Sequence, residues 1–198
     1  MPPLSRLDEV TIDKTSGLIE GVRQVPSPNC DDRPPGIDVD LIVVHGISLP
    51  PGEFGGPWID ALFTNTLNPD AHPYFRGLQS ARVSAHVVIR RDGDLVQYVP
   101  FHRRAWHAGA SRFEGRERCN DFSIGIELEG TDDLPYEDVQ YRVLARMVHS
   151  LMKVYPHIGP QRVVGHSTVA PGRKTDPGLA FDWGRLYRLL DATLENKN

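Results

Sequence analysis

Apolar residues along the chain fall into short β-branched runs and into longer stretches with helical spacing. Leu41–Val44 is a continuous apolar run, which is typical of a central strand covered on both faces. Residues 84–90 and 95–99 are two further strand-like runs, and the Asp92–Gly93 pair between them predicts a β-hairpin. Residues 17–25 fit an edge strand that ends at two prolines. The pattern therefore predicts several strands of one sheet.

Two more strands are expected in the second half of the chain. Ser123–Glu129 alternates, with three apolar residues on one face and two carboxylates, Glu127 and Glu129, on the other. Paired acids on an exposed sheet face are usually solvated, but a strand beside a cleft could supply a general base from them. Val163 and Val164 form a short apolar run that indicates a buried strand ending at Gly165.

Helical spacing is clearest over residues 137–155, where apolar positions recur on one face, acids come first, Lys153 lies near the end and Pro156 stops the helix. A final helix is predicted over about residues 183–194, and Pro57 suits the start of a short helix through about Thr64. Loops are expected at residues 26–36, 65–79 and 101–121, from their turn-forming residues and their lack of periodicity.

Length and composition set the broad class. The chain has 198 residues, which fits one domain; residues 1–16 are polar and aperiodic and predict a loosely held arm before a domain over residues 17–198. A formal net charge of −4 argues against general nucleic-acid binding. No apolar run approaches the ~20 residues of a membrane span, and the first residues lack a secretory pattern, so a cytoplasmic location is expected. Cys30 and Cys119, far apart, are expected to be free thiols.

Candidate chemistry begins with two histidines that follow apolar strands. His45 comes after Leu41–Val44 and His166 after the Val163–Gly165 segment. A neutral imidazole at a strand end is a suitable metal ligand, although a single such histidine is more often structural. Ligands gather outside the carboxyl ends of strands in open α/β sheets, so the two histidines would converge if their strands are parallel neighbours.

The segment after His166 adds a cation and a carboxylate. Asp176 lies ten positions beyond His166, across a loop with Pro171 and Gly172 that could fold back to the imidazole, and Lys174 precedes Asp176 by two residues. The alternative is a surface loop with a solvated lysine and a turn-capping aspartate. Two ligands alone make a weak motif, and a third is needed from elsewhere.

Two residues, Trp106 and His86, each leave two interpretations open. Trp106, in the long loop, could stack on a sugar or a peptide, or it could cover the core. His86, inside its predicted strand, could line a cleft but is at least as well explained as a structural histidine. For His107 the sequence indicates no role.

Four segments together carry a family resemblance. These are LIVVHGISLPPGEFGGPWIDALF, RVSAHVVIRRDGDLVQYVPF, RAWHAGASRFEGRERCNDFSIGIELEGTDD and GHSTVAPGRKTDPGLAFDW. The chain resembles the type 2 N-acetylmuramoyl-L-alanine amidases, which depend on zinc, and among them the cytosolic group that acts on 1,6-anhydro muropeptides. The similarity runs from about residue 18 to 190. It implies a mixed α+β domain with a central mixed sheet flanked by helices, in agreement with the predicted elements.

The resemblance assigns roles to residues of this chain. It implies that His45, His166 and Asp176 bind one Zn²⁺ per chain and leave a fourth position for water, as in catalytic zinc sites. Glu127 matches the general base, and Lys174 matches the cation that stabilises the oxyanion together with the metal. Zinc would lower the pKa of its water to ~7.

The implied substrate is the amide between N-acetylmuramic acid, or its anhydro form, and L-alanine of the stem peptide. Arg82 and Arg118 match positions that hold stem-peptide carboxylates, and Trp106 and Ala170 match cleft positions. The implied partner is this small-molecule muropeptide, with no nucleic acid, membrane or obligate protein partner. One departure is Gly46, where close relatives carry asparagine.

Two other functions were compared with this one. Peptidoglycan-recognition proteins bind muropeptides without cleaving them and usually lack a zinc ligand, whereas this chain lacks none. An exported amidase would act on intact peptidoglycan, and the start of the chain does not favour export.

Overall fold

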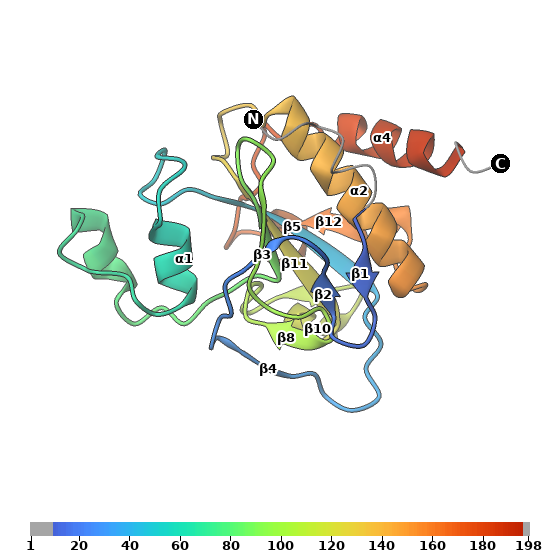
Figure 1. Cartoon of the computed structure of the whole chain (residues 1–198), viewed down its shortest axis with the longest axis horizontal. Coiled ribbons are helices and arrows are strands. Elements are labelled where there is room, and N and C mark those ends of the chain that lie inside the picture. Colours follow the sequence, from blue (N-terminus) through green and yellow to red (C-terminus); the bar gives the residue numbers. More distant parts are fainter. Residues whose placement is uncertain (1–9, 196–198) are drawn as a thin grey trace.

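A computed structural model describes residues 10–195, and its main sheet has six strands in the order β12-β5-β11-β6-β7-β3 (Figure 1). The neighbours from β12 to β6 run parallel, β7 is antiparallel to β6, and β3 is parallel to β7. The strands are β3 (Arg23–Gln24), β5 (Leu41–Ile47), β6 (Val87–Ile89), β7 (Leu95–Gln97), β11 (Ser123–Glu129) and β12 (Val163–Gly165). The expected mixed sheet and the β6–β7 hairpin are confirmed.

Short two-stranded pairs surround this sheet. They are β1 (Ile12–Asp13) with β2 (Leu18–Ile19), β4 (Cys30–Asp32) with β8 (Arg103–Ala105), and β9 (Arg112–Phe113) with β10 (Arg116–Glu117). The helices are α1 (Trp58–Phe63), η2 (Pro73–Leu78), η3 (Cys119–Asp121), α2 (Asp138–Val154), η4 (Pro160–Arg162), α3 (His166–Val169) and α4 (Trp183–Glu195). Within residues 10–195, no helix is long and apolar enough to cross a membrane.

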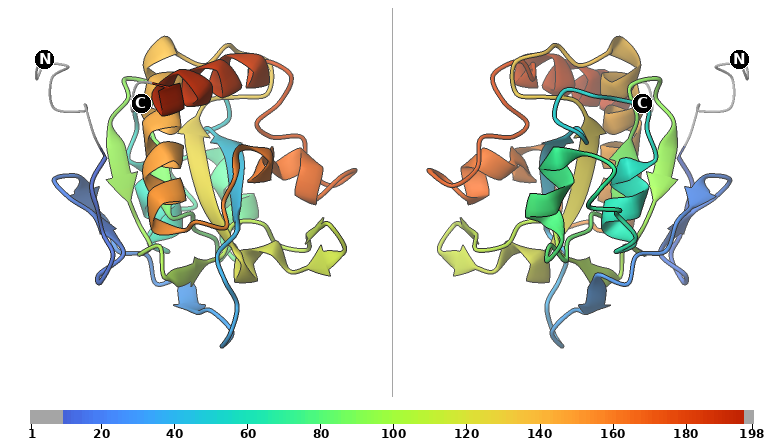
Figure 2. Two further views of the ribbon diagram at one scale, coloured as in Figure 1. Left: turned by 90° about the vertical axis from the view of Figure 1, so that its right-hand side faces the viewer. Right: turned by 90° about the vertical axis from the view of Figure 1, so that its left-hand side faces the viewer.

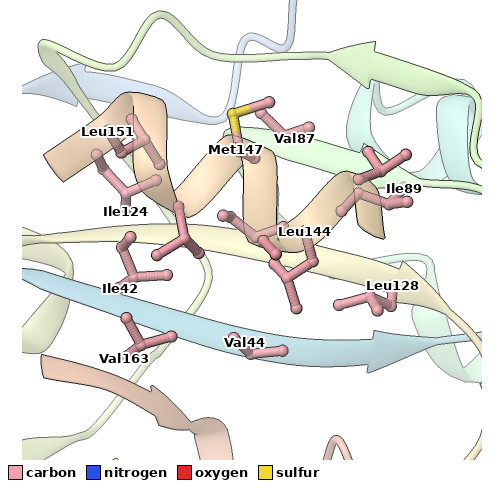
Figure 3. Close-up of a cluster of buried hydrophobic side chains, with 14 of the residues drawn as sticks. Ile42, Val44, Val87, Ile89, Ile124, Leu128, Leu144, Met147, Leu151 and Val163 are labelled. Atoms are coloured by element: carbon pink, nitrogen blue, oxygen red, sulfur yellow. The ribbon is translucent and has the colours of Figure 1, made fainter. Parts of the chain in front are cut away.

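Helix α2 covers one face of the sheet, and α4 lies beside it (Figures 1 and 2). Leu144, Met147 and Leu151 of α2 pack on sheet residues that include Ile42 and Val44 (Figure 3). Because side chains alternate along a strand, Leu41 and Val43 belong to a different buried cluster on the opposite face. His45 follows the same alternation, so it lies on the face away from α2.

The predicted helix boundaries hold within one or two residues. Helix α2 occupies 138–154 of the predicted 137–155, and the Gln140 side chain accepts a hydrogen bond from the Glu137 backbone N–H at 3.0 Å before its first turn. Helix α1 begins after Pro57, as expected.

Several boundaries differ from the sequence expectation. Strand β5 continues to Ile47, so His45 lies inside the strand and not at its end. The expected strand over residues 17–25 is divided into β2 and β3, because Gly21 adopts a positive φ of 72° between them. The loop over residues 101–121 contains β8, β9, β10 and η3.

The predicted N-terminal arm falls only partly within the described residues. Residues 1–9 lie outside them. Of the remainder, Val10 is buried in the core, and Ile12–Asp13 pairs with Leu18–Ile19. Cys30 and Cys119 are free thiols, as expected.

Candidate active site

The structure brings His45, His166 and Asp176 into one cluster. The two Nδ1 atoms lie 3.0 Å apart, and Asp176 Oδ2 lies 3.1 Å from His45 Nδ1 and 3.0 Å from His166 Nδ1. Both histidines are buried and Asp176 is half-buried. The predicted convergence of these three residues is therefore a feature of the fold.

Adjacent parallel strands explain the meeting of the histidines. His45 lies on β5, and His166 directly follows β12, which pairs with β5 in parallel register. Asp176 returns to them because its backbone carbonyl accepts a hydrogen bond from Ser167 N at 3.0 Å. Tyr136 Oη also donates to the carbonyl of Pro177 at 3.0 Å, which fixes the next residue of the loop.

The three facing atoms fit a divalent cation. Hydrogen bonds cannot explain all three short contacts of this triangle. If both imidazoles donate from Nδ1 to Asp176, the two Nδ1–H groups face each other and cannot bond to one another. A cation can instead accept one lone pair from each atom. Zinc bonds of about 2.0–2.2 Å in tetrahedral geometry separate neighbouring ligand atoms by about 3.3 Å, close to the separations here. The donor set, two imidazoles and one carboxylate, is also one that zinc prefers.

Charge states in the cluster agree with metal binding. Burial lowers the pKa of His45 to about 4, so its imidazole is neutral and can offer a lone pair. Burial alone would raise the pKa of Asp176, but its close contacts with His166 and His45 outweigh burial and hold the pKa below the usual range. The cluster thus presents a neutral imidazole at His45 and an ionised carboxylate at Asp176.

Glu127 lies beside this cluster. It pairs in register with His45 on the neighbouring parallel strand, so both side chains leave the sheet on the same face. Only 9% of Glu127 is exposed, and its Oε2 has no hydrogen-bond partner among the described residues. Burial, and then the charge of Asp176, raise the pKa of Glu127 well above its ordinary value, while Lys174 opposes them. A buried carboxylate with a free oxygen is suited to accept a proton.

Glu129 is the other acid of this strand, and both of its carboxylate oxygens accept hydrogen bonds. The expectation of an exposed acidic face is wrong, because all seven residues of β11 are buried. Glu129 Oε1 accepts hydrogen bonds from Gly55 N at 2.7 Å and Arg90 Nη1 at 3.2 Å, and Oε2 accepts one from Arg91 N at 3.2 Å. Glu129 therefore ties the loop after β5 to the β6–β7 hairpin and has no free oxygen for catalysis.

Replacing Glu129 with alanine is expected to lower the free energy of unfolding by about 1–3 kcal/mol, because Gly55 N and Arg91 N would lose their acceptor and the buried Arg90 would keep only Asp60 as an ion-pair partner. Urea unfolding measures this change. The control is Asp70→Ala, which removes an exposed partner of Arg76 and should leave the midpoint nearly unchanged. A stable Glu129→Ala variant with reduced turnover would instead give this residue a chemical role.

Lys174 lies on the loop that leads to Asp176. Its backbone N–H donates to the Ala170 carbonyl at 3.0 Å, and its side chain is exposed. Its charge contributes to lowering the pKa values of His45 and Glu127, so it lies within electrostatic reach of both. This placement suits a cation that acts at the edge of the cluster.

The four predicted substrate contacts are placed differently. Arg118 and Ala170 line a cavity of about 540 Å³ together with Arg173. Trp106 is half-buried, and its Nε1–H donates to Asp31 at 3.1 Å. The Arg82 guanidinium donates to the carbonyls of Gln79 and Ala81, so it folds back on its own loop.

A network of ion pairs joins two of these positions. Arg104 binds both Asp31, the partner of Trp106, and Asp121. Asp121 in turn lies 3.3 Å from the Arg118 side chain. No local sequence pattern indicates this network, because its members are up to 90 positions apart. Glu129 and Arg90 line a separate cavity of about 580 Å³, and none of the predicted site residues lines it.

The structure also gives a spatial context for Gly46. A Cβ atom built on Gly46 would collide with the Tyr136 hydroxyl, the same group that binds the Pro177 carbonyl. The space beside the first histidine is thus occupied by Tyr136, a residue that no sequence pattern had indicated.

The fold, with its central mixed sheet, agrees with the comparisons to known proteins. The sequence model of the N-acetylmuramoyl-L-alanine amidases matches residues 35–179, and the chain belongs to this family. It is 62% identical over 174 residues to the 1,6-anhydro-N-acetylmuramyl-L-alanine amidase AmpD of Escherichia coli K12, covering 88% of this chain and 94% of that protein.

Solved structures show the same relationship. A crystal structure of a selenomethionine derivative of AmpD superposes with a TM-score of 0.88 at 59% identity, over 91% of this chain and 99% of that one. The amidase AmiD of E. coli, in complex with the substrate anhydro-N-acetylmuramic acid-L-Ala-D-γ-Glu-L-Lys, has a TM-score of 0.56 at 28% identity, over 79% of this chain and 60% of that one. The expected fold class is thereby confirmed.

Proposed function

We propose that this chain is a zinc-dependent amidase that hydrolyses the bond between 1,6-anhydro-N-acetylmuramic acid and L-alanine of the stem peptide. The observation that carries the proposal is the triangle of His45, His166 and Asp176 with the unpartnered carboxylate of Glu127 beside it. The names of the similar AmpD proteins and the ligand of the AmiD complex support the substrate class. The predicted cytoplasmic location and a part in cell-wall recycling belong to the same proposal.

In this proposal His45, His166 and Asp176 hold the zinc ion. When bound, the ion supplies a Lewis acid that polarises the amide carbonyl and lowers the pKa of water. Glu127 accepts a proton from the attacking water and then delivers it to the departing nitrogen. This proton transfer needs a base with a raised pKa close to the metal, as Glu127 has. Lys174 places a positive charge where the carbonyl oxygen becomes negative.

Binding of the stem peptide is assigned to the cavity next to α3. Arg118 and Ala170 line it, and a guanidinium fork suits the carboxylates of the peptide. Trp106 offers an indole held in place by Asp31, on which a sugar or peptide group could stack. Arg82 remains a predicted contact that would have to leave its own loop carbonyls to reach the peptide.

The test is incubation with a defined anhydromuropeptide, mass spectrometry of the products and metal analysis of the same sample. Release of free stem peptide is expected with one zinc ion per chain, together with loss of turnover on chelation and recovery when zinc is added back. Turnover that persists after the metal is stripped would contradict the mechanism. Binding without release would instead indicate a recognition protein, and faster turnover of intact sacculi an enzyme of the cell wall.

A further inference from the structure

Both histidines of the cluster make their outer hydrogen bonds to the same dipeptide, His107–Ala108. His45 Nε2 lies 3.0 Å from His107 Nδ1, and His166 Nε2 lies 3.2 Å from the Ala108 carbonyl. A carbonyl only accepts, so His166 carries its proton on Nε2 and leaves Nδ1 free toward Asp176 and His45. The outer contact of His45 is less direct, because a second imidazole takes the place of the carbonyl.

The proton positions in the contact between His45 and His107 follow from a series of hydrogen bonds that ends at the Cys119 carbonyl. Ser123 Oγ donates to the Cys119 carbonyl at 2.6 Å and so uses its single proton there. Toward His107 Nε2, which lies 3.2 Å away, Ser123 therefore accepts, and His107 carries its proton on Nε2. The ring is buried and contacts no carboxylate among the described residues, so a positive charge on it would be uncompensated; its other nitrogen, Nδ1, is therefore an acceptor.

The tautomer of His107 sets the tautomer of His45 in the metal cluster. Because His107 Nδ1 accepts, His45 donates from Nε2 and its own Nδ1 holds a lone pair. That atom is the one that faces His166 and Asp176. The Cys119 carbonyl, at the end of this series of hydrogen bonds, thus determines the tautomer that His45 must have to bind a cation.

The dipeptide itself is firmly held. Asn120 Oδ1 accepts hydrogen bonds from His107 N at 3.2 Å and from Ala108 N at 2.8 Å, and Arg173 donates to the Ala108 carbonyl at 2.6 Å. The His107 ring also lies directly against Gly125 of β11, where any Cβ atom would collide with it. Gly125, between Ser123 and Glu127 on the same strand face, is thus the residue that admits the ring.

We propose that His107 is a positioning residue for the metal site, which fixes His45 in the tautomer that points Nδ1 at the cation. The inference rests on the proposed function, since it presupposes that the cluster binds a metal. It adds a residue to which neither the sequence analysis nor the comparisons assign a role. Outer partners of ligating histidines fix ring orientation and ligand basicity, and their loss typically weakens metal binding by about 10-fold to 100-fold.

The test is a set of variants whose zinc affinity is measured by competition with a chromophoric chelator. His107→Phe keeps a ring but removes the acceptor, so we expect zinc affinity about 10-fold to 100-fold below that of the wild-type chain. His107→Asn should recover part of this loss, because its Oδ1 can accept from His45. Ser123→Ala, a small change that preserves packing, should weaken binding less than His107→Phe, because the ring stays but its tautomer is released.

The matched control is His86→Phe. His86 is also buried and adjoins His107 at a ring distance of 5.8 Å, but its ring nitrogens contact Gly125 N, the Arg103 carbonyl and Arg33 Nη2 and not His45 or His166. Its loss should lower the stability of the fold in urea and leave zinc affinity nearly unchanged. Equal losses of affinity in His86→Phe and His107→Phe would overturn the inference, because they would reflect general packing.

Nitrogen-15 NMR of the zinc-loaded wild-type and Ser123→Ala proteins provides a second readout. The wild-type spectrum should show His45 protonated at Nε2 and metal-bound at Nδ1; the opposite assignment would overturn the inference. Wild-type zinc affinity in His107→Phe would overturn it as well and leave the proposed function standing. A wild-type chain that binds no zinc would contradict the proposed function itself.

Discussion

Replacing Glu127 with glutamine should lower kcat by about 10²-fold to 10⁴-fold while zinc stays bound. Glutamine has nearly the shape of the protonated acid, so packing around β11 should be preserved, but the amide accepts no proton from water. Glu127 is also outside the His45–His166–Asp176 triangle, and its Oε2 binds no other described residue. Loss of its charge therefore removes chemistry and leaves the ligands in place.

The measurement is turnover of a defined anhydromuropeptide at saturating substrate, with zinc content determined on the same preparation. Glu20→Gln is the control, because Glu20 is exposed on the turn after β2 and should show wild-type kinetics. A Glu127→Gln variant with full zinc content and wild-type kcat would remove Glu127 from the mechanism. A variant that has lost its zinc would show that Glu127 supports the metal site instead.

Replacing Asp176 with alanine should weaken zinc binding at least about 100-fold, beyond what the loss of an outer contact costs. Asp176 contributes the one negative charge of the triangle and lies within 3.1 Å of both imidazoles. Without it, two histidines remain, one ligand fewer than the three protein ligands of a catalytic zinc site. Turnover should fall in proportion to the fraction of chains without metal.

Chelator competition measures the affinity, and turnover with excess zinc shows whether activity returns when the site is filled. The neighbouring Thr175→Ala variant is the control, because Thr175 is exposed and is not part of the triangle. Unchanged zinc affinity in Asp176→Ala would exclude Asp176 as a ligand. The proposed three-ligand site would then have to be abandoned.

The elements with regular patterns were predictable from the chain. The apolar run of β5, the Asp92–Gly93 hairpin and the amphipathic helix α2 all follow from local periodicity. The errors lie where long-range packing overrides local pattern. Strand β5 runs three residues further than its apolar core because β11 pairs with it through Ile47. The polar face of β11 is buried as well, where the His107 ring lies against Gly125 and the Gly55 backbone binds Glu129.

The candidate site was only partly predictable. His45, His166 and Asp176 could be named because each residue type can ligate zinc, and the family resemblance joined them. The residue pattern alone did not distinguish Glu127 from Glu129, since both occupy polar positions of one strand, and only the family resemblance named Glu127 as the general base. Their difference arises from Gly55, Arg90 and Arg91, which bind only Glu129.

The sequence by itself determined the elements, the single-domain class and the residues able to carry metal-assisted amide hydrolysis, because periodicity and residue chemistry are local properties. Only the tertiary structure decided which carboxylate keeps a free oxygen, that His107 and Ala108 hold the outer nitrogens of both histidines, and that Tyr136 fills the space beside Gly46. The contacts of His107, Ala108 and Tyr136 join residues 58 to 90 positions apart. Their partners are selected by strand order and burial, which no local pattern specifies.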